Sequence, residues 1–83
     1  MTYFVYLIGN YKKTKLVTYA GYTHNLKKRL DLHNKGKGAK FTRGRIWKLL
    51  YYEKFRTKRE AILREYYIKK NRKFRNSIIN KFK

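Results

Sequence analysis

The chain has 83 residues, and its 24 Lys and Arg against four Asp and Glu give it a formal net charge of +20. So much charge on a small body indicates a polyanionic partner. Because 42% of the residues are hydrophobic and 18% aromatic, we expect one folded domain over residues 1–83, not a disordered basic tail. The absence of cysteine excludes disulfides and thiolate zinc sites.

Nucleic acid is the leading partner that this charge predicts. An anionic membrane surface is the alternative, but the sequence has no clean amphipathic anchor. The apolar run at residues 3–8 is too short to span a bilayer, and no signal peptide follows from it. We therefore expect a cytoplasmic protein that does not bind membranes.

The first half of the chain predicts a β-hairpin. Residues 3–8 (YFVYLI) are continuously apolar, as in a central strand with both faces buried. The polar residues 9–14 predict a turn, and residues 15–22 (KLVTYAGY) predict a second strand. The two strands are expected to pair antiparallel.

A helix is expected next, capped by Thr23 or Asn25 and running to about Asn34. A basic loop over residues 35–45 follows it, and the apolar pattern of residues 46–55 (IWKLLYYEKF) predicts a third strand.

The last part of the chain predicts two helices. Thr57 and Glu60 form a capping box, which begins a helix that runs to about Asn71. A short helix is expected within the basic segment 73–83. The order β-β-α-β-α-α predicts an α+β fold, with a small three-stranded, mostly antiparallel sheet flanked by helices.

Carboxylates are scarce, which narrows the search for a metal ligand. Glu60 is explained by its cap, and Asp31 and Glu53 by solvent or a lysine partner. Glu65 instead falls within the apolar stripe of its helix, where a carboxylate needs a cation, a metal or hydrogen bonds. A salt bridge to an arginine is slightly favoured from the residues alone, and a ligand for Mg²⁺ is the functional interpretation.

Four other side chains are candidates for chemistry. Arg29 and His33 lie at i and i+4 on the inward side of the first helix. Arg29 either extends its head to solvent or holds a phosphate, and His33 is either a packed core residue or a proton acceptor. Tyr6 and Tyr19 lie on paired strands, although most of the nine tyrosines must serve packing.

These residues resemble a known family. Residues 5–7 (VYL) and 19–21 (YAG) resemble the two signatures of GIY-YIG nucleases, and Arg29 falls ten residues after Tyr19, as the family's arginine does. Residues 61–65 (AILRE) resemble the start of the family's metal-glutamate helix, and Asn76 stands where many members carry a late asparagine.

A more specific resemblance lies in residues 36–43 (GKGAKFTR). This string is similar to that of the small stand-alone bacterial branch, which is related to the nuclease domain of Slx1 structure-specific endonucleases. The signature region covers about residues 3–76, and the basic C-terminal segment 69–83 overlaps its end. Many family nucleases carry a separate targeting domain, so a protein partner that supplies targeting is a further expectation.

The resemblance implies a nuclease that uses one divalent ion, Mg²⁺ or Mn²⁺, held by Glu65. Arg29 would stabilise charge on the phosphate, and Tyr6 or Tyr19 would position and deprotonate the attacking water. Positive charge nearby, including His33, would have to lower the tyrosine pKa for this. Asn76 would support the site by orienting the metal helix or a phosphate.

Basic side chains are expected to hold the nucleic acid backbone. They are Lys37, Lys40, Arg43, Arg45, Lys69, Lys70 and Arg72. Phosphate contacts carry no sequence information, so we expect structure-selective cleavage of DNA with weak sequence preference and steep salt dependence. The alternative is a non-catalytic DNA- or RNA-binding module on the same fold.

Overall fold

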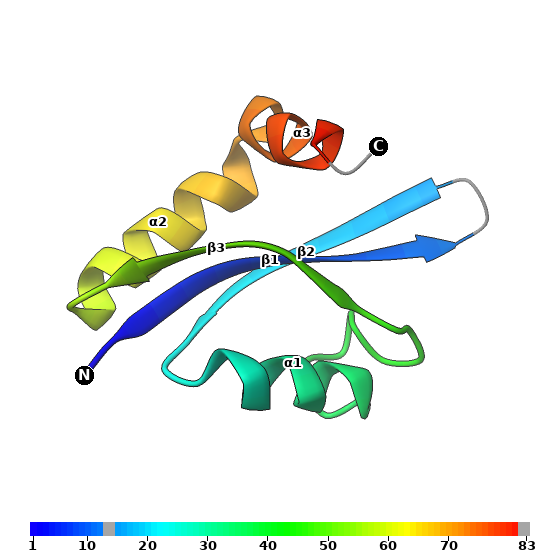
Figure 1. Ribbon diagram of the computed structural model, residues 1–83, viewed down its shortest axis with the longest axis horizontal. Coiled ribbons are helices and arrows are strands. Elements are labelled where there is room, and N and C mark those ends of the chain that lie inside the picture. The colour runs from blue at the N-terminus through cyan, green and yellow to red at the C-terminus, as the bar shows by residue number, and fades with distance from the viewer. Residues whose placement is uncertain (13–14, 82–83) are drawn as a thin grey trace.

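A three-stranded antiparallel sheet separates two helical layers, with α1 on one face and α2 and α3 on the other (Figure 1). The computed structural model describes residues 1–12 and 15–81. Its elements are β1 (Tyr3–Lys12), β2 (Lys15–Thr23), α1 (Leu26–Asn34), β3 (Lys48–Phe55), α2 (Lys58–Lys70) and α3 (Arg72–Asn80). The predicted α+β class and the order β-β-α-β-α-α are confirmed.

Strand β1 lies at the centre of the sheet, paired antiparallel to β2 on one side and to β3 on the other. Its apolar run is buried on both faces, as the sequence predicts. Val5 and Leu7 point to one face and Tyr6 and Ile8 to the other, because successive side chains alternate along a strand. A slip of one residue would exchange the two sets between the faces.

The sheet therefore divides the core into two clusters. On the face covered by α2 and α3, the buried cluster is Val5, Leu7, Ala20, Ala61, Ile68 and Ile78. On the face covered by α1, Tyr6 and Ile8 pack against Trp47, and Leu26 and Leu30 of the helix complete that cluster. Each of the three strands therefore contributes side chains to both clusters.

The predicted turn over residues 9–14 is wrong for its first four residues. Strand β1 continues to Lys12, and its pairing with β2 reaches Lys12 opposite Lys15. Ladder hydrogen bonds along the hairpin outweigh the local turn signals of Gly9 and Asn10. The rest of the predicted turn, Lys13 and Thr14, lies outside the described residues.

The third strand begins two residues later than predicted. Residue Trp47 precedes the strand, and its backbone is bonded to Asn34 at the end of α1: Trp47 N donates to Asn34 Oδ1 at 2.6 Å, and Asn34 Nδ2 donates to Trp47 O at 3.2 Å. A side chain 13 positions away therefore supplies the partners that a strand neighbour would supply.

Helix α1 begins and ends through local chemistry. Of the two caps that the sequence allows, Asn25 is the cap, and its Oδ1 accepts from Lys28 N at 3.1 Å. Past the last turn, Gly36 has a φ of 76°, and Lys37 N donates to Leu32 O at 2.8 Å. This left-handed glycine turns the chain out of the helix and satisfies a terminal carbonyl.

Helix α2 is capped as its sequence indicates, and α3 is capped as well. The Thr57 hydroxyl accepts from Glu60 N at 3.2 Å and lies 2.9 Å from Glu60 Oε1, to which it donates. Asn71 separates the helices, and its Oδ1 accepts from Phe74 N at 2.9 Å. Within the part of the chain that is described, the helices are too short and too polar to cross a membrane.

An ion pair between α2 and β3 holds α2 in place on the sheet. Glu53 accepts from Arg64 Nε at 2.8 Å and from Arg64 Nη2 at 2.9 Å, so its partner is an arginine and not the expected lysine. The guanidinium also lies over the rings of Tyr67 and Phe74, at 4.7 and 4.8 Å from their centres. Arg64 lowers the pKa of Glu53 by hydrogen bonding to its charged form.

Replacing Arg64 with glutamine is expected to lower the free energy of unfolding by about 2 kcal/mol, between the effects of exposed and buried pairs. The reason is that both partners are largely buried, with side-chain exposures of 31% and 19%. Urea unfolding measures the change. Lys35→Gln is the matched control: it breaks the exposed pair with Asp31 and should cost less than about 0.5 kcal/mol. Equal losses in the two variants would contradict the prediction.

Candidate active site

A cleft of about 570 Å³ lies along the edge strand β2, between α1 and α2. Four of the predicted site residues line it, each from a different element: Tyr6 from β1, Tyr19 from β2, Arg29 from α1 and Glu65 from α2. The remaining lining residues are Met1, Tyr3, Gly21, Tyr22, Thr23, His24 and Lys58. Folding thus brings together side chains that are far apart in the sequence.

His33 lies beneath the cleft and not in its wall. It is fully buried, with Nε2 at 2.8 Å from the Tyr6 hydroxyl and Nδ1 at 2.9 Å from Thr42 Oγ1. The Thr42 hydroxyl donates its proton to Ala39 O at 3.0 Å, so its oxygen accepts from His33 Nδ1–H. Nε2 is then free to accept from the Tyr6 hydroxyl. The chain of bonds directs the Tyr6 proton toward His33.

The pKa of Tyr6 is shifted opposite to the expectation. Burial raises the pKa of Tyr6, and Arg29 opposes this without cancelling it. Burial lowers the pKa of His33, and Arg29 lowers it further. His33 is therefore neutral near pH 7 and supplies no positive charge to the tyrosine. What it supplies is a basic nitrogen within hydrogen-bond distance of the hydroxyl.

The neutral, buried His33 predicts that the protein loses stability as the pH falls. The unfolded chain takes up this proton near the ordinary pKa of 6.5, whereas the folded protein does so only at lower pH. The contribution of His33 to the free energy of unfolding is therefore fully present above pH 6.5. It declines as the pH drops from there through the pKa of His33 in the folded protein. Melting temperatures between about pH 8 and pH 5 measure this.

The control for that experiment is the second histidine. His33→Gln is expected to remove the slope, whereas His24→Gln, which replaces an exposed residue, should keep it. The other ionisable groups that face His33 are Tyr6, Tyr19 and Arg29, and these stay in both variants. A slope that persists in His33→Gln would show that another group carries the pH dependence.

Gly21 makes the approach of Tyr6 to the cleft possible. A side chain on Gly21 would collide with the Tyr6 hydroxyl, since a Cβ there would overlap the phenol oxygen. Gly21 pairs with Tyr6 across the hairpin. Because Gly21 has no side chain, the Tyr6 ring can occupy the space above it. This steric requirement explains why a glycine stands at the end of the second signature.

Arg29 points a cation into the cleft and leaves part of it unpaired. Its Nη2 donates to Gly38 O at 3.4 Å, a long bond. Its Nε is buried and has no hydrogen-bond acceptor among the residues that the structure describes. A buried donor without a partner is costly, and an anionic acceptor entering the cleft would complete it. A phosphate oxygen has the required charge and geometry.

Glu65 is the carboxylate of the cleft. Its partner is Lys69, with Lys69 Nζ 3.3 Å from Glu65 Oε1, so the expected arginine partner is wrong. The Glu65 side chain is 18% exposed and reaches the cleft surface. No group of three potential metal ligands occurs within residues 1–12 and 15–81. One carboxylate suits a Mg²⁺ ion that takes its other ligands from water and substrate phosphate.

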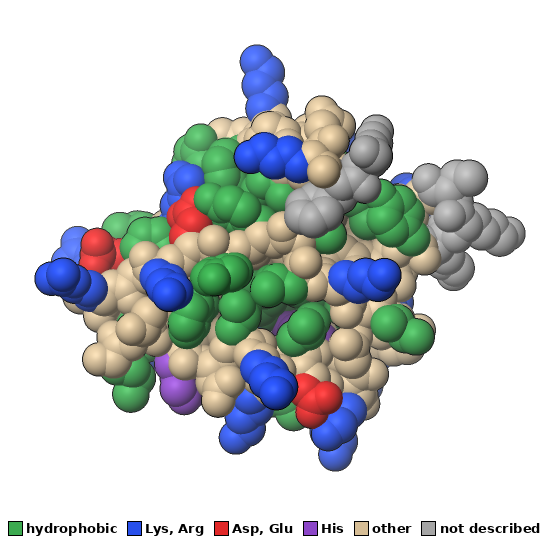
Figure 2. All heavy atoms as spheres, viewed as in Figure 1, with side chains coloured by type: hydrophobic (Ala, Val, Ile, Leu, Met, Phe, Trp, Pro, Cys, Tyr) green, Lys and Arg blue, Asp and Glu red, His purple; other side chains and the backbone are tan. Residues whose placement is uncertain are grey.

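The other predicted residues lie outside this cleft. Asn76 is exposed on α3 and does not line it. Of the predicted backbone contacts, Arg45 is half-buried and the rest are exposed: Lys37, Lys40, Arg43, Lys69, Lys70 and Arg72. In Figure 2 the Lys and Arg side chains are spread over the viewed face and project from its outline, with hydrophobic side chains between them.

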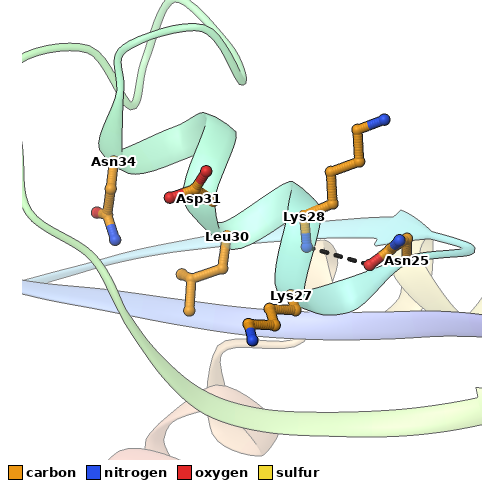
Figure 3. A pocket seen from close by; sticks show the side chains of 6 residues that line it. All are labelled: Asn25, Lys27, Lys28, Leu30, Asp31 and Asn34. Atoms are coloured by element: carbon orange, nitrogen blue, oxygen red, sulfur yellow. Dashed lines mark hydrogen bonds between the residues drawn. The ribbon is translucent and has the colours of Figure 1, made fainter.

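A second hollow lies along α1 and gathers none of the four candidate residues. It is lined by Asn25, Lys27, Lys28, Leu30, Asp31 and Asn34 (Figure 3). Leu30 points toward the sheet and Lys28 away from it (Figure 3). Asp31 is exposed and paired with Lys35, as a solvated carboxylate would be. The hollow lacks an unpaired buried donor, so the β2 cleft is the better candidate.

Among the residues of the site that sequence reasoning missed, three are notable. Thr42 is fully buried and fixes the tautomer of His33, and Lys58 and His24 line the cleft. Thr42 lies within the string that suggested the bacterial branch, which was the only available signal. Its role depends on a contact nine positions back along the chain, and no local pattern reports that contact.

The geometry agrees with a comparison to protein families. The model of the GIY-YIG catalytic domain matches residues 2–80. The chain belongs to the GIY-YIG family. GIY-YIG proteins form a nuclease family, whose members act on nucleic acid and generally use a divalent metal ion.

Individual relatives support the same membership. The chain is 64% identical over 53 residues to a UPF0213 protein of Bacillus licheniformis, covering 63% of this chain and 55% of that protein. It is 62% identical over 53 residues to a UPF0213 protein of Clostridium perfringens, covering 63% and 57%. The matches thus span a little over half the length of these relatives.

A solved structure is also similar. The solution structure of a UPF0213 protein from Bacillus halodurans is 35% identical, with a TM-score of 0.51 over 96% of this chain and 84% of that one. The predicted GIY-YIG resemblance is confirmed, and these relatives are bacterial UPF0213 proteins. The relation to structure-specific endonucleases and the single-domain extent remain predictions.

Proposed function

We propose that this GIY-YIG protein is a divalent-metal-dependent endonuclease that cuts DNA, selecting structure more than sequence. The observation that carries the proposal is the convergence of Tyr6, Tyr19, Arg29 and Glu65 on one cleft. Beside them lies a buried arginine nitrogen that has no acceptor among the described residues. A protein that only bound nucleic acid would not require a carboxylate in this cleft, because the carboxylate repels the phosphate.

Arg29 is proposed to bind the scissile phosphate through Nε and the free part of its guanidinium. The planar fork matches two phosphate oxygens. Its charge stabilises the extra negative charge that develops on those oxygens in the transition state. A buried, preorganised donor does this without reorganising during the reaction.

Tyr6 is proposed to act on the attacking water with His33 behind it. The water O–H breaks as Tyr6 takes that proton, and the proton that Tyr6 held passes to His33 Nε2, 2.8 Å away. The oxygen attacks phosphorus, the bond to the 3′ oxygen breaks, and that oxygen takes a proton from solvent. Because burial raises the Tyr6 pKa, transfer to His33 replaces prior ionisation of the phenol.

Tyr19 is proposed to position the substrate and not to accept a proton. Its ring lies edge-on to His33, with centres 5.2 Å apart, and Lys69 Nζ lies 5.8 Å from the centre of its ring. Asn76 is proposed to support the site through α3 or through a phosphate that extends beyond the cleft.

Glu65 is proposed to hold one Mg²⁺ or Mn²⁺, after release of Lys69. The bound ion would neutralise charge on the phosphate and on the leaving oxygen. The donor set fits this, since one carboxylate with water and phosphate oxygens is an ordinary Mg²⁺ environment. The displaced Lys69 then joins the exposed basic residues that hold the backbone.

The competing proposal is a binding module without catalysis, which the Lys69–Glu65 ion pair favours because a lysine occupies the carboxylate. The test is incubation of the full chain with Mg²⁺ and single-stranded, flapped, branched and fully paired DNA, with matched RNA. Metal-dependent cuts, most frequent in flapped or branched DNA, are expected. If every substrate stays intact while binding persists, the protein is a binding module.

A further inference from the structure

A second, smaller groove adjoins the candidate active site on the other side of Tyr19. It has a volume of about 380 Å³ and is lined by Thr18, Tyr19, Ala20, Phe41, Lys69 and Arg75. Tyr19 lines both the groove and the cleft. Lys69, on the rim of the groove, is bonded to Glu65 in the cleft. A strand whose phosphate lies in the cleft would therefore place a neighbouring nucleotide in the groove.

Phe41 gives the groove an aromatic wall that packing explains only in part. Phe41 is 52% exposed and lies in the basic loop between α1 and β3. Its ring lies nearly parallel to Tyr19, with centres 6.0 Å apart and planes inclined by 21°. Leaving half of a phenylalanine in water gives up burial energy, so a ligand that covers the ring is a reason for its exposure.

Cations surround this aromatic pair. Lys69 Nζ lies 5.8 Å from the Tyr19 ring centre, and the Arg45 guanidinium lies 5.7 Å from the Phe41 ring centre. Arg75 uses Nη1 to bond the carbonyls of Ile68 and Lys69 at the end of α2. A flat aromatic surface beside cations suits a ligand that has a planar ring and an anionic group attached to it.

We propose that this groove binds an unpaired nucleobase next to the scissile phosphate, stacked on Phe41 and Tyr19, with Lys69 and Arg75 contacting its phosphate. An unpaired base offers both faces for stacking, whereas a paired base in a duplex is already stacked. The inference deepens the proposed function, on which it rests for the strand in the cleft. It assigns the structure selectivity to Phe41, through recognition of an unpaired nucleotide.

The test measures binding without cleavage. Two DNA probes share the same duplex arms and carry 2-aminopurine beside the junction, unpaired in one and paired in the other. In EDTA, the full chain is expected to quench the unpaired probe and bind it more tightly. Phe41→Ala should abolish the quenching and weaken that binding by roughly five- to 150-fold, the range for loss of one stacked base. The affinity for the paired probe should change less than about twofold.

Further variants separate stacking from packing, because Phe41 also contacts Trp47, at 6.3 Å between ring centres. Phe41→Leu keeps an apolar side chain without a ring and should behave as Phe41→Ala, whereas Phe41→Tyr should behave as wild type. Tyr66→Ala removes an exposed ring of α2 that does not line the groove and should leave both affinities unchanged. Melting temperatures establish that the variants are folded.

The proposal is overturned if Phe41→Ala lowers the affinity for both probes equally, or if Phe41→Leu binds the unpaired probe as tightly as wild type. It is also overturned if the fluorescence of neither probe is quenched. An RNA version of the unpaired strand shows whether the groove distinguishes the sugar. Because binding is measured without metal, the test of the groove does not depend on cleavage. A protein that cuts no substrate can still stack the unpaired base. Conversely, a protein that cuts flapped DNA without quenching keeps the proposed function and loses the nucleobase groove.

Discussion

Glu65→Gln is expected to lower metal-dependent cleavage by at least about 10³-fold, because metal stabilisation of charge contributes several kcal/mol and each 1.4 kcal/mol is tenfold. Glutamine keeps the shape of the side chain but removes its negative charge. Binding of uncut DNA should be unchanged or slightly tighter, since the cleft loses a group that repels phosphate. Cleavage rates over a Mg²⁺ series, with binding measured in EDTA, separate the two effects.

Asp31→Asn is the matched control for this variant. It removes the same charge from an exposed carboxylate on α1, which is paired with Lys35 outside the cleft. Its cleavage rate should stay within about twofold of wild type, because a solvated pair contributes little. If Glu65→Gln cuts as fast as Asp31→Asn, the assignment of the metal ligand is wrong, although the nuclease activity itself would stand.

Tyr6→Phe is expected to lower the cleavage rate by about 10²- to 10⁴-fold, the usual contribution of a positioned proton acceptor. The variant loses only the hydroxyl that lies between the cleft and His33. In the wild type, activity should fall on the acid side as His33 takes up a proton, at a pH below its ordinary pKa of 6.5. Rates measured across pH in both proteins check the assignment.

Tyr51→Phe controls for the loss of a bonded phenol. The Tyr51 hydroxyl donates to Glu53 on the sheet face opposite α1 and lies outside the cleft. Tyr51→Phe is expected to lose stability without losing cleavage rate per folded molecule. Tyr19→Phe should retain most activity, since the ring of Tyr19 and not its hydroxyl makes the contacts around the site. Comparable losses in Tyr6→Phe and Tyr19→Phe would contradict the separate roles proposed for them.

Much of the fold could be predicted because its signals are local. The apolar run of β1, the cap at Asn25 and the capping residues Thr57 and Glu60 each depend on neighbours within a few positions. The predicted turn failed over residues 9–12 for the complementary reason. Its local signals were outweighed by a ladder whose partners lie across the hairpin.

The candidate site divides in the same way. The scarcity of carboxylates directed attention to Glu65, and helical spacing directed it to Arg29 and His33. The structure brings Glu65 and Arg29 into one cleft and places His33 behind it. The ion-pair partners of the two glutamates could not be predicted from the sequence: Glu65 pairs with Lys69, and Glu53 pairs with Arg64. With 24 cations in the chain, composition alone cannot select a partner.

The sequence by itself determined the charge, the order of the elements and the residue types available for chemistry, because these depend on composition and local periodicity. Only the tertiary structure decided that Tyr6 directs its proton to His33 and that a buried donor of Arg29 has no acceptor in the part of the chain that is described. It also decided that Phe41 stands beside Tyr19 at the edge of the cleft. Those relations join β1, β2, α1 and the loop that follows it, and packing across the sheet sets their distances.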